Sequence, residues 1–185
     1  MVTGVIVASL IAGIVITAVL FIYVMRNHMV ADITVDGDFE SVNRAIKSAV
    51  PKFDGWSFPI TTWEFYKSQL SKNLTYDNIR NMVIHFVCKP SHANKMLQLV
   101  PSMGGIMPCS WAVYETTDGK VHIAKMNINL MSKMYSGTIK EIMTDVAQTE
   151  KAMLSKIEQQ LKNGNIRTKD SDKTDEQDRE LVSVG

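Results

Sequence analysis

The first 25 residues constrain the fold most, because none of their side chains is charged. Within them, GVIVASLIAGIVITAVLFIYVM supplies about 22 apolar or small residues, enough for a helix to cross a hydrocarbon core of about 30 Å. A cleaved signal peptide is the competing interpretation, but no basic residue precedes the run and FIYVMRNHM offers no small-residue cleavage site. The sequence therefore predicts a retained transmembrane helix, a signal-anchor, over residues 1–25. A juxtamembrane joint is expected over residues 26–31.

Charges on the two flanks of this segment predict its orientation. Only the terminal amine precedes it, whereas Arg26 follows it directly and Arg44, Lys47 and Lys52 come soon after. Cytoplasmic flanks of membrane spans carry an excess of Lys and Arg. We therefore expect a single-pass protein of the cell membrane whose globular domain lies in the cytoplasm.

Small residues recur at every fourth position of the apolar segment, at Ser9, Gly13 and Thr17. On a helix this spacing makes one stripe along which a second helix backbone can approach closely. The stripe predicts contact with a second copy of the chain or with a membrane-protein partner. A helix that faces only lipid is the alternative.

Composition limits the rest of the chain to one modest domain. The 185 residues carry a formal net charge of +1 and are 45% hydrophobic, which suits one domain with appendages rather than two. No excess of basic residues indicates a nucleic-acid partner. The two cysteines are too few for a disulfide framework and lack the CxxC spacing of zinc sites.

The first half of this domain is predicted to contain two strands and two helices. DITVDG is expected to form a short strand. The helix after it should begin at Asp38 as N-cap and bury a stripe of Phe39, Val42, Ala45, Ile46 and Ala49. WSFPITTW is a second predicted strand, at an edge or a bulge because Pro59 cannot donate to a sheet. EFYKSQLSKN forms one short helix at most.

The second half is predicted to hold the centre of the sheet. NMVIHFVC is mostly apolar on both faces, which is typical of a central strand. PSHANKMLQLV follows as a helix, PSMGGIMP as a loop, and CSWAVYETTDGKVHIAKMNI as a hairpin with an Asp-Gly turn. A long amphipathic helix then reaches Leu161, with a break at Gly137 and a stop at Gly164.

The predicted elements follow the order β-α-β-α-β-α-β-β-α over residues 32–162. The fold class is therefore α+β, with a single mixed sheet packed with helices and preceded by one transmembrane helix. The polar residues 163–185 are expected to be a disordered tail.

Several short motifs of this domain form a recognisable set. They are a DGDFE helix start, Cys-x-Pro after a strand, a Pro-x-x-Gly loop and Pro-Cys-x-x-x-Val-Tyr-Glu. The residues are Asp38, Phe39, Glu40, Cys88, Pro90, Ala93, Leu97, Pro101, Gly104, Pro108, Cys109, Val113, Tyr114, Glu115, Gly119 and Lys120. Over about residues 32–161 the chain resembles the domain of unknown function 302 family.

This resemblance implies a small bacterial or archaeal α+β domain that tends to form homodimers and has no settled activity. The chain departs from the family pattern at Lys89, at Ser110-Trp111 and in its added transmembrane anchor.

The two cysteines are the candidate reactive groups. Cys88 lies where a strand passes into a helix, beside Lys89, a setting that lowers the pKa of an exposed thiol. The alternative is that Cys88 is a small packed residue. Cys109, at the start of an apolar strand, is expected to be largely buried and structural. If their strands are antiparallel, both cysteines share one sheet edge, and if parallel they lie at opposite edges.

A cluster of soft ligands is a further hypothesis. Thiolate, thioether and imidazole suit Cu(I) or a haem iron, and the candidates are Cys88, His92, Met103, Met107 and Cys109. The alternative is ordinary core packing, for which methionine is a common filler.

The predicted function is that of a membrane-anchored binding or accessory module for a membrane-associated partner or a small ligand. The alternative is a thiol-based redox, sulfur-handling or metal- or haem-binding protein that uses Cys88 and Cys109. A non-enzymatic role is favoured, because the chain shows no Ser-His-Asp order, phosphate loop or dinucleotide fingerprint. No particular cofactor is indicated.

Overall fold

The structure is a computed structural model that describes residues 2–182, with side chains up to Gly164 except those at positions 2, 5 and 8. Its centre is a four-stranded sheet in the order β1-β4-β3-β2. The strands are β1 (Val30–Val35), β2 (Ile79–Val87), β3 (Cys109–Thr116) and β4 (Val121–Met126). The α+β class with a single sheet is confirmed. The sheet is antiparallel throughout rather than mixed, because each pair of neighbouring strands runs in opposite directions.

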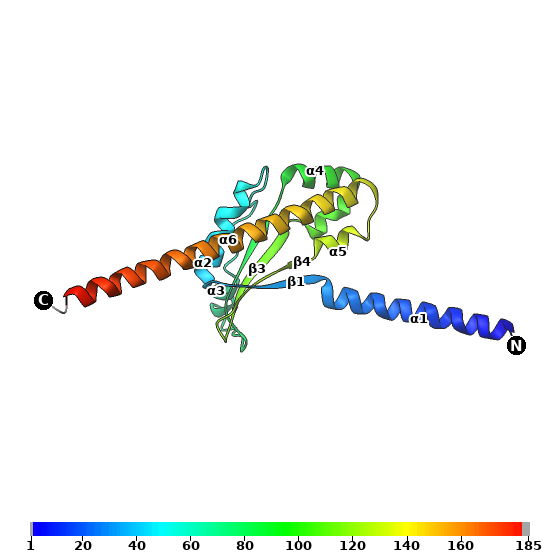
Figure 1. The fold of residues 1–185 in the computed structure, drawn as a ribbon. Helices are drawn as coiled ribbons and strands as arrows, with labels where there is room; N and C mark the ends of the chain where they lie inside the picture. Colours follow the sequence, from blue (N-terminus) through cyan, green and yellow to red (C-terminus); the bar gives the residue numbers. More distant parts are fainter. Residues whose placement is uncertain (1, 183–185) are drawn as a thin grey trace.

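The main core lies between one face of the sheet and two helices, α2 (Phe39–Ala49) and α6 (Gly137–Val182) (Figure 1). The predicted stripe of α2 is confirmed: Val42, Ala45, Ile46 and Ala49 are buried, and Phe39 packs partly buried against the cluster. The side chain of Asp38 caps α2, since its Oδ1 accepts a hydrogen bond from the backbone N–H of Ser41 at 2.8 Å. The 3₁₀ turn Val50–Lys52, which contains Pro51, ends the helix.

The segment predicted as a second strand, residues 56–63, does not form one. It touches β2 through two isolated antiparallel bridges, Ser57 with Cys88 and Trp63 with Ile84. Pro59 lies between the bridges and has no N–H to continue a ladder, which explains the interruption. As a result β2 is the last full strand of the sheet rather than a central one, and residues 57–63 cover its outer edge.

The remaining helices of the domain are short. They are α3 (Phe65–Leu70), α4 (Pro90–Leu99), the 3₁₀ helix η2 (Pro101–Ile106) where a loop was expected, and α5 (Ile128–Ser132). The β3–β4 hairpin turns at Gly119, whose φ of +83° favours glycine. Gly137, with φ +57°, separates α5 from α6 as predicted.

The helix α6 continues through Gly164 to Val182, whereas the sequence predicted a stop there and a disordered tail. A single glycine costs a helix only about 1 kcal/mol. The residues after it are mainly charged and polar types that helices tolerate. Among the described side chains, Leu161 is the last one of α6 in the core cluster.

The first helix, α1 (Val2–His28), runs almost directly into β1. Residues 26–31, predicted as a joint, form the end of α1 and the start of β1. The junction is tied to the domain by Asn127, whose Nδ2 donates to the carbonyl of His28 at 3.0 Å. The backbone N–H of Asn127 donates to the carbonyl of Met29 at 2.8 Å.

Candidate functional site

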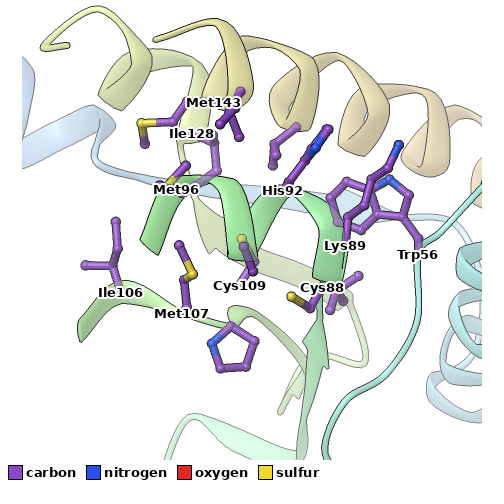
Figure 2. A pocket seen from close by; sticks show the side chains of 15 residues that line it. Trp56, Cys88, Lys89, His92, Met96, Ile106, Met107, Cys109, Ile128 and Met143 are labelled. Atoms are coloured by element: carbon purple, nitrogen blue, oxygen red, sulfur yellow. The ribbon is translucent and has the colours of Figure 1, made fainter. Parts of the chain in front are cut away.

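An apolar pocket lies at the end of the sheet where α4 and α6 meet the end of β2 and the start of β3. Its volume is about 60 Å³. Figure 2 shows Cys88, Met107 and Cys109 on the side formed by the strand ends, opposite Met143 on α6. Because the lining consists almost entirely of carbon and sulfur atoms, the pocket suits an apolar group.

Strand pairing brings the two cysteines to this pocket. Cys109 is directly opposite Val87 in the β2–β3 ladder, so that Cys88 lies at the same end of the sheet. The antiparallel alternative of the sequence analysis is therefore the one observed. Neither cysteine forms a disulfide. The backbone of Cys88 is held by Ser57 through two hydrogen bonds of 2.9 and 3.0 Å.

Both thiols are in surroundings that disfavour the thiolate. Burial raises the pKa of Cys109 to about 12, with a further contribution from the Glu150 carboxylate and partial opposition from Lys125. Burial also raises the pKa of Cys88. This differs from the expected lowering at the start of α4, because loss of solvation outweighs the helix end and Lys89. Both side chains are protonated at neutral pH.

Four of the five predicted soft ligands line the pocket: Cys88, His92, Met107 and Cys109. Met103 does not line the pocket but is buried in the core cluster to which the pocket-lining Met96 and Met143 also belong. The imidazole Nε2 of His92 is 2.6 Å from the Asp145 carboxylate on α6, which holds the ring near the helix surface. Among the described residues no group of three or more His, Cys, Asp or Glu side chains is arranged to hold a metal. Ligation of a metal or haem by this set stays a prediction.

A buried ion pair behind the pocket was not predicted from the sequence. Lys125 Nζ lies 2.6 Å from Glu150 Oε2, and the indole N–H of Trp111 donates to Glu150 Oε1 at 3.1 Å. Strand alternation with Val121 and Ile123 could have placed Lys125 on the inner face. These hydrogen bonds satisfy the Glu150 carboxylate inside the core and join α6 to β3 and β4.

A second polar network lies on the same face of the sheet, at His85. Its Nε2 is 2.7 Å from Asn43 Oδ1 and its Nδ1 is 3.0 Å from Thr62 Oγ1. The Asn43 amide donates to the carbonyl of Phe39, so its Oδ1 faces His85 as an acceptor. Burial lowers the pKa of His85 to about 4. The neutral ring therefore serves as a connector between α2 and β2.

The family model described as Domain of unknown function DUF302 matches residues 31–160. The chain belongs to the DUF302 family. The fold is also similar to the crystal structure of an uncharacterized conserved DUF302 protein from Bacillus stearothermophilus, at 21% identity and a TM-score of 0.60. That alignment covers 70% of this chain and 98% of the other. No curated protein matches the chain with significant similarity.

Some of the DUF302 motif residues shape the backbone, and others line the pocket. Asp38 and Gly119 shape the backbone at a helix cap and a turn. Others gather at the pocket, namely Cys88, Ala93, Pro108 and Cys109. The resemblance seen in the sequence is thus confirmed at the level of family and fold, and Cys88, Pro108 and Cys109 of its most specific motifs line one cavity.

Proposed function

We propose that the chain is a membrane-anchored binding module whose pocket takes the apolar end of a small ligand. The observation that carries the proposal is the apolar pocket between α4, α6 and the strand ends, lined by both cysteines in their protonated form. A protonated thiol behaves as a small hydrophobic group. The pocket therefore offers shape and apolar contact rather than a nucleophile.

The helix α1 supports the anchor. Its 27 residues correspond to about 40 Å, longer than a hydrocarbon core of about 30 Å. The window Ser9–His28 has a mean hydropathy of 2.2, and none of it is buried against the domain. An apolar helix without protein cover needs lipid around it, and a bilayer supplies that environment.

The size of the pocket limits the ligand. A dry cavity of about 150 Å³ admits benzene, so about 60 Å³ suits a smaller apolar group. The tip of an acyl or isoprenoid chain fits this description. The rest of such a molecule would lie outside the domain.

Thiol chemistry and soft-metal binding are the less favoured alternatives. Both would use the thiolate forms of Cys88 and Cys109, and the surroundings favour the protonated forms. The raised thiol pKa values thus favour apolar binding over either alternative.

The proposal is tested by filling the pocket from one wall. Ala93 lines the pocket on α4, whereas its neighbour Asn94 is exposed and does not line it. Xenon added to the full chain in detergent micelles should shift the methyl signals of Ile106, Ile128 and Ile142. The variant Ala93→Leu should lose these shifts, and Asn94→Leu should keep them.

A lack of xenon-induced shifts at these three isoleucines in the unmodified chain would contradict an accessible apolar pocket. Equal shifts in the unmodified chain and in a folded Ala93→Leu variant would also contradict it. Retention of the far-ultraviolet circular dichroism spectrum identifies a folded variant, because Trp56 lines the pocket and its fluorescence can change when the pocket is filled.

A further inference from the structure

We infer that the end of the domain that holds the pocket rests on the bilayer surface, so that the pocket receives an acyl or isoprenoid chain end directly from the membrane. This inference rests on the proposed anchor and the proposed pocket. It adds the surface that meets the lipid and the route by which the ligand arrives.

The first step is the junction between α1 and the domain. Helix α1 ends at His28 and β1 begins at Val30, which leaves one residue between them. The carbonyls of His28 and Met29 both accept hydrogen bonds from Asn127. A junction this short, with two hydrogen bonds to the domain, fixes the direction in which the domain faces the membrane.

The second step is that α1 and the pocket share one end of the sheet. Val30, the first residue of β1, pairs with Met126 at the end of β4. The adjacent Lys125 pairs with Trp111 near the start of β3, which begins with Cys109 at the pocket. Figure 1 shows α1 leaving from the end where α4 and α5 lie, while the last part of α6 leaves from the opposite end.

The third step is the exposure of large apolar side chains at this end. Leu99 at the end of α4 is 53% exposed, and Met134 between α5 and α6 is 56% exposed. Leu97 and Ile106 are also exposed, and Ile106 in addition lines the pocket. Ile106 therefore joins the exposed apolar surface to the pocket.

The residues beside Met134 fit an interfacial position. Lys133 is exposed and Tyr135 is half-buried, so both have polar tips that can reach the headgroup region. An anchor held at this end brings these side chains to the bilayer before any soluble partner. The membrane is thus the occupant that the attachment of α1 favours.

Photo-crosslinking from single positions tests the inference. The photoreactive residue p-benzoylphenylalanine is placed at Leu99, at Met134, or at Leu74 as a matched control. Leu74 is 50% exposed but precedes β2, at the end of the sheet where Asn78 bonds to Thr117 of the β3–β4 turn. The full chain is reconstituted in vesicles of phosphatidylcholine and phosphatidylglycerol, washed with carbonate and irradiated.

We expect lipid adducts at Leu99 and Met134 and none above background at Leu74. If the chain stays with the vesicles but the three positions give equal adducts, or none, the surface is wrong while the anchor stands. Crosslinks from Leu99 to a second copy in place of lipid would overturn the inference in the same way. If the chain leaves the vesicles on washing, the proposed anchor itself fails, and the inference fails with it.

Discussion

At the scale of single residues, the two cysteines show how burial overrides local sequence. Cys88 precedes a helix and adjoins Lys89, both of which stabilise a thiolate in water. In the folded domain the surrounding apolar atoms disfavour the charge more than these neighbours favour it, so the pKa of Cys88 is raised. The pKa of Cys109 is raised more strongly, first because Cys109 is more deeply buried and second because Glu150 adds a negative charge nearby.

We predict that both thiols react slowly with iodoacetamide near neutral pH. For a thiol whose pKa lies above the assay range, each unit of pH raises the thiolate fraction about tenfold. The alkylation rate of each thiol should therefore keep rising through pH 9. At every pH, Cys109 should react more slowly than Cys88. The variants Cys88→Ser and Cys109→Ser separate the two rates by mass spectrometry. A rate that levels off below pH 8 at either thiol would be inconsistent with this account.

At the scale of elements, His85 connects three parts of the chain. It lies on β2, Asn43 lies on α2, and Thr62 lies in the segment that covers the sheet edge. The neutral imidazole can donate through Nε2 and accept through Nδ1, so that all three groups are satisfied. Protonation would turn Nδ1 into a second donor and add a charge inside the core.

This network predicts that the domain loses stability on mild acidification. The pKa of His85 is about 4 when folded and 6.5 in its ordinary state, so the unfolded chain binds the proton first. The neutral His85 network contributes to the free energy of unfolding above pH 6.5. This contribution is lost as the pH falls toward 4, by up to about 3 kcal/mol. Urea unfolding in micelles, followed by tryptophan fluorescence, measures this loss.

The variant His85→Gln keeps hydrogen-bonding groups but does not titrate, so its stability should fall less over the same pH range. The variant His92→Gln serves as the control, because it removes a partly buried imidazole that pairs with Asp145 and lies outside the His85 network. An equally steep loss in His85→Gln would show that other groups cause the acid sensitivity.

Local signals predicted the elements better than they predicted the sheet. The cap at Asp38, the turn at Gly119 and the break at Gly137 depend on nearby residues and were foreseen. The position of β2 was not, because strand order depends on partners far along the chain. Both faces of β2 are mostly apolar, which predicted a central strand, but among the described residues its outer edge is covered only by the two bridges from Ser57 and Trp63.

Only part of the candidate site was predicted, because some of its residues come from distant parts of the chain. The sequence proposed Cys88, His92, Met107 and Cys109 together, and antiparallel pairing does bring them to one pocket. Met103 on η2 does not line the pocket but is buried in the core cluster that also holds the pocket-lining Met96 and Met143, so its role as a ligand stays a prediction. Wall residues from α5 and α6, such as Ile128 and Met143, carry no local signal that links them to a cysteine.

At the scale of the whole molecule, the chain has apolar surface at one end and a charged helix at the other. Helix α1 leaves from the pocket end, and α6 extends beyond the core at the opposite end (Figure 1). Described side chains of α1 have no cover from the domain over the apolar window. This arrangement separates the pocket end, which is proposed to meet lipid, from the far end of α6, which can contact aqueous partners.

The charges that flank the apolar segment predict on which side of the membrane the domain lies. Arg26 follows the apolar run, so the domain should lie in the cytoplasm. Protease added to intact spheroplasts should leave the domain whole, and the same protease should digest it after lysis. A periplasmic protein of the same cells, cleaved without lysis, shows that the protease is active. Cleavage of the domain before lysis would reverse the topology.

The short junction between α1 and β1 limits the direction from which another helix can approach α1. An α-helix turns by about 100° per residue, and Asn127 holds the carbonyls of His28, the last residue of α1, and of Met29 against the domain. The azimuth of Ser9, Gly13 and Thr17 around the helix axis is therefore set by the attachment of α1 to the domain. One residue inserted after His28 would rotate that stripe about a quarter of a turn relative to the pocket. Any helix packed there would then meet the domain from a different side.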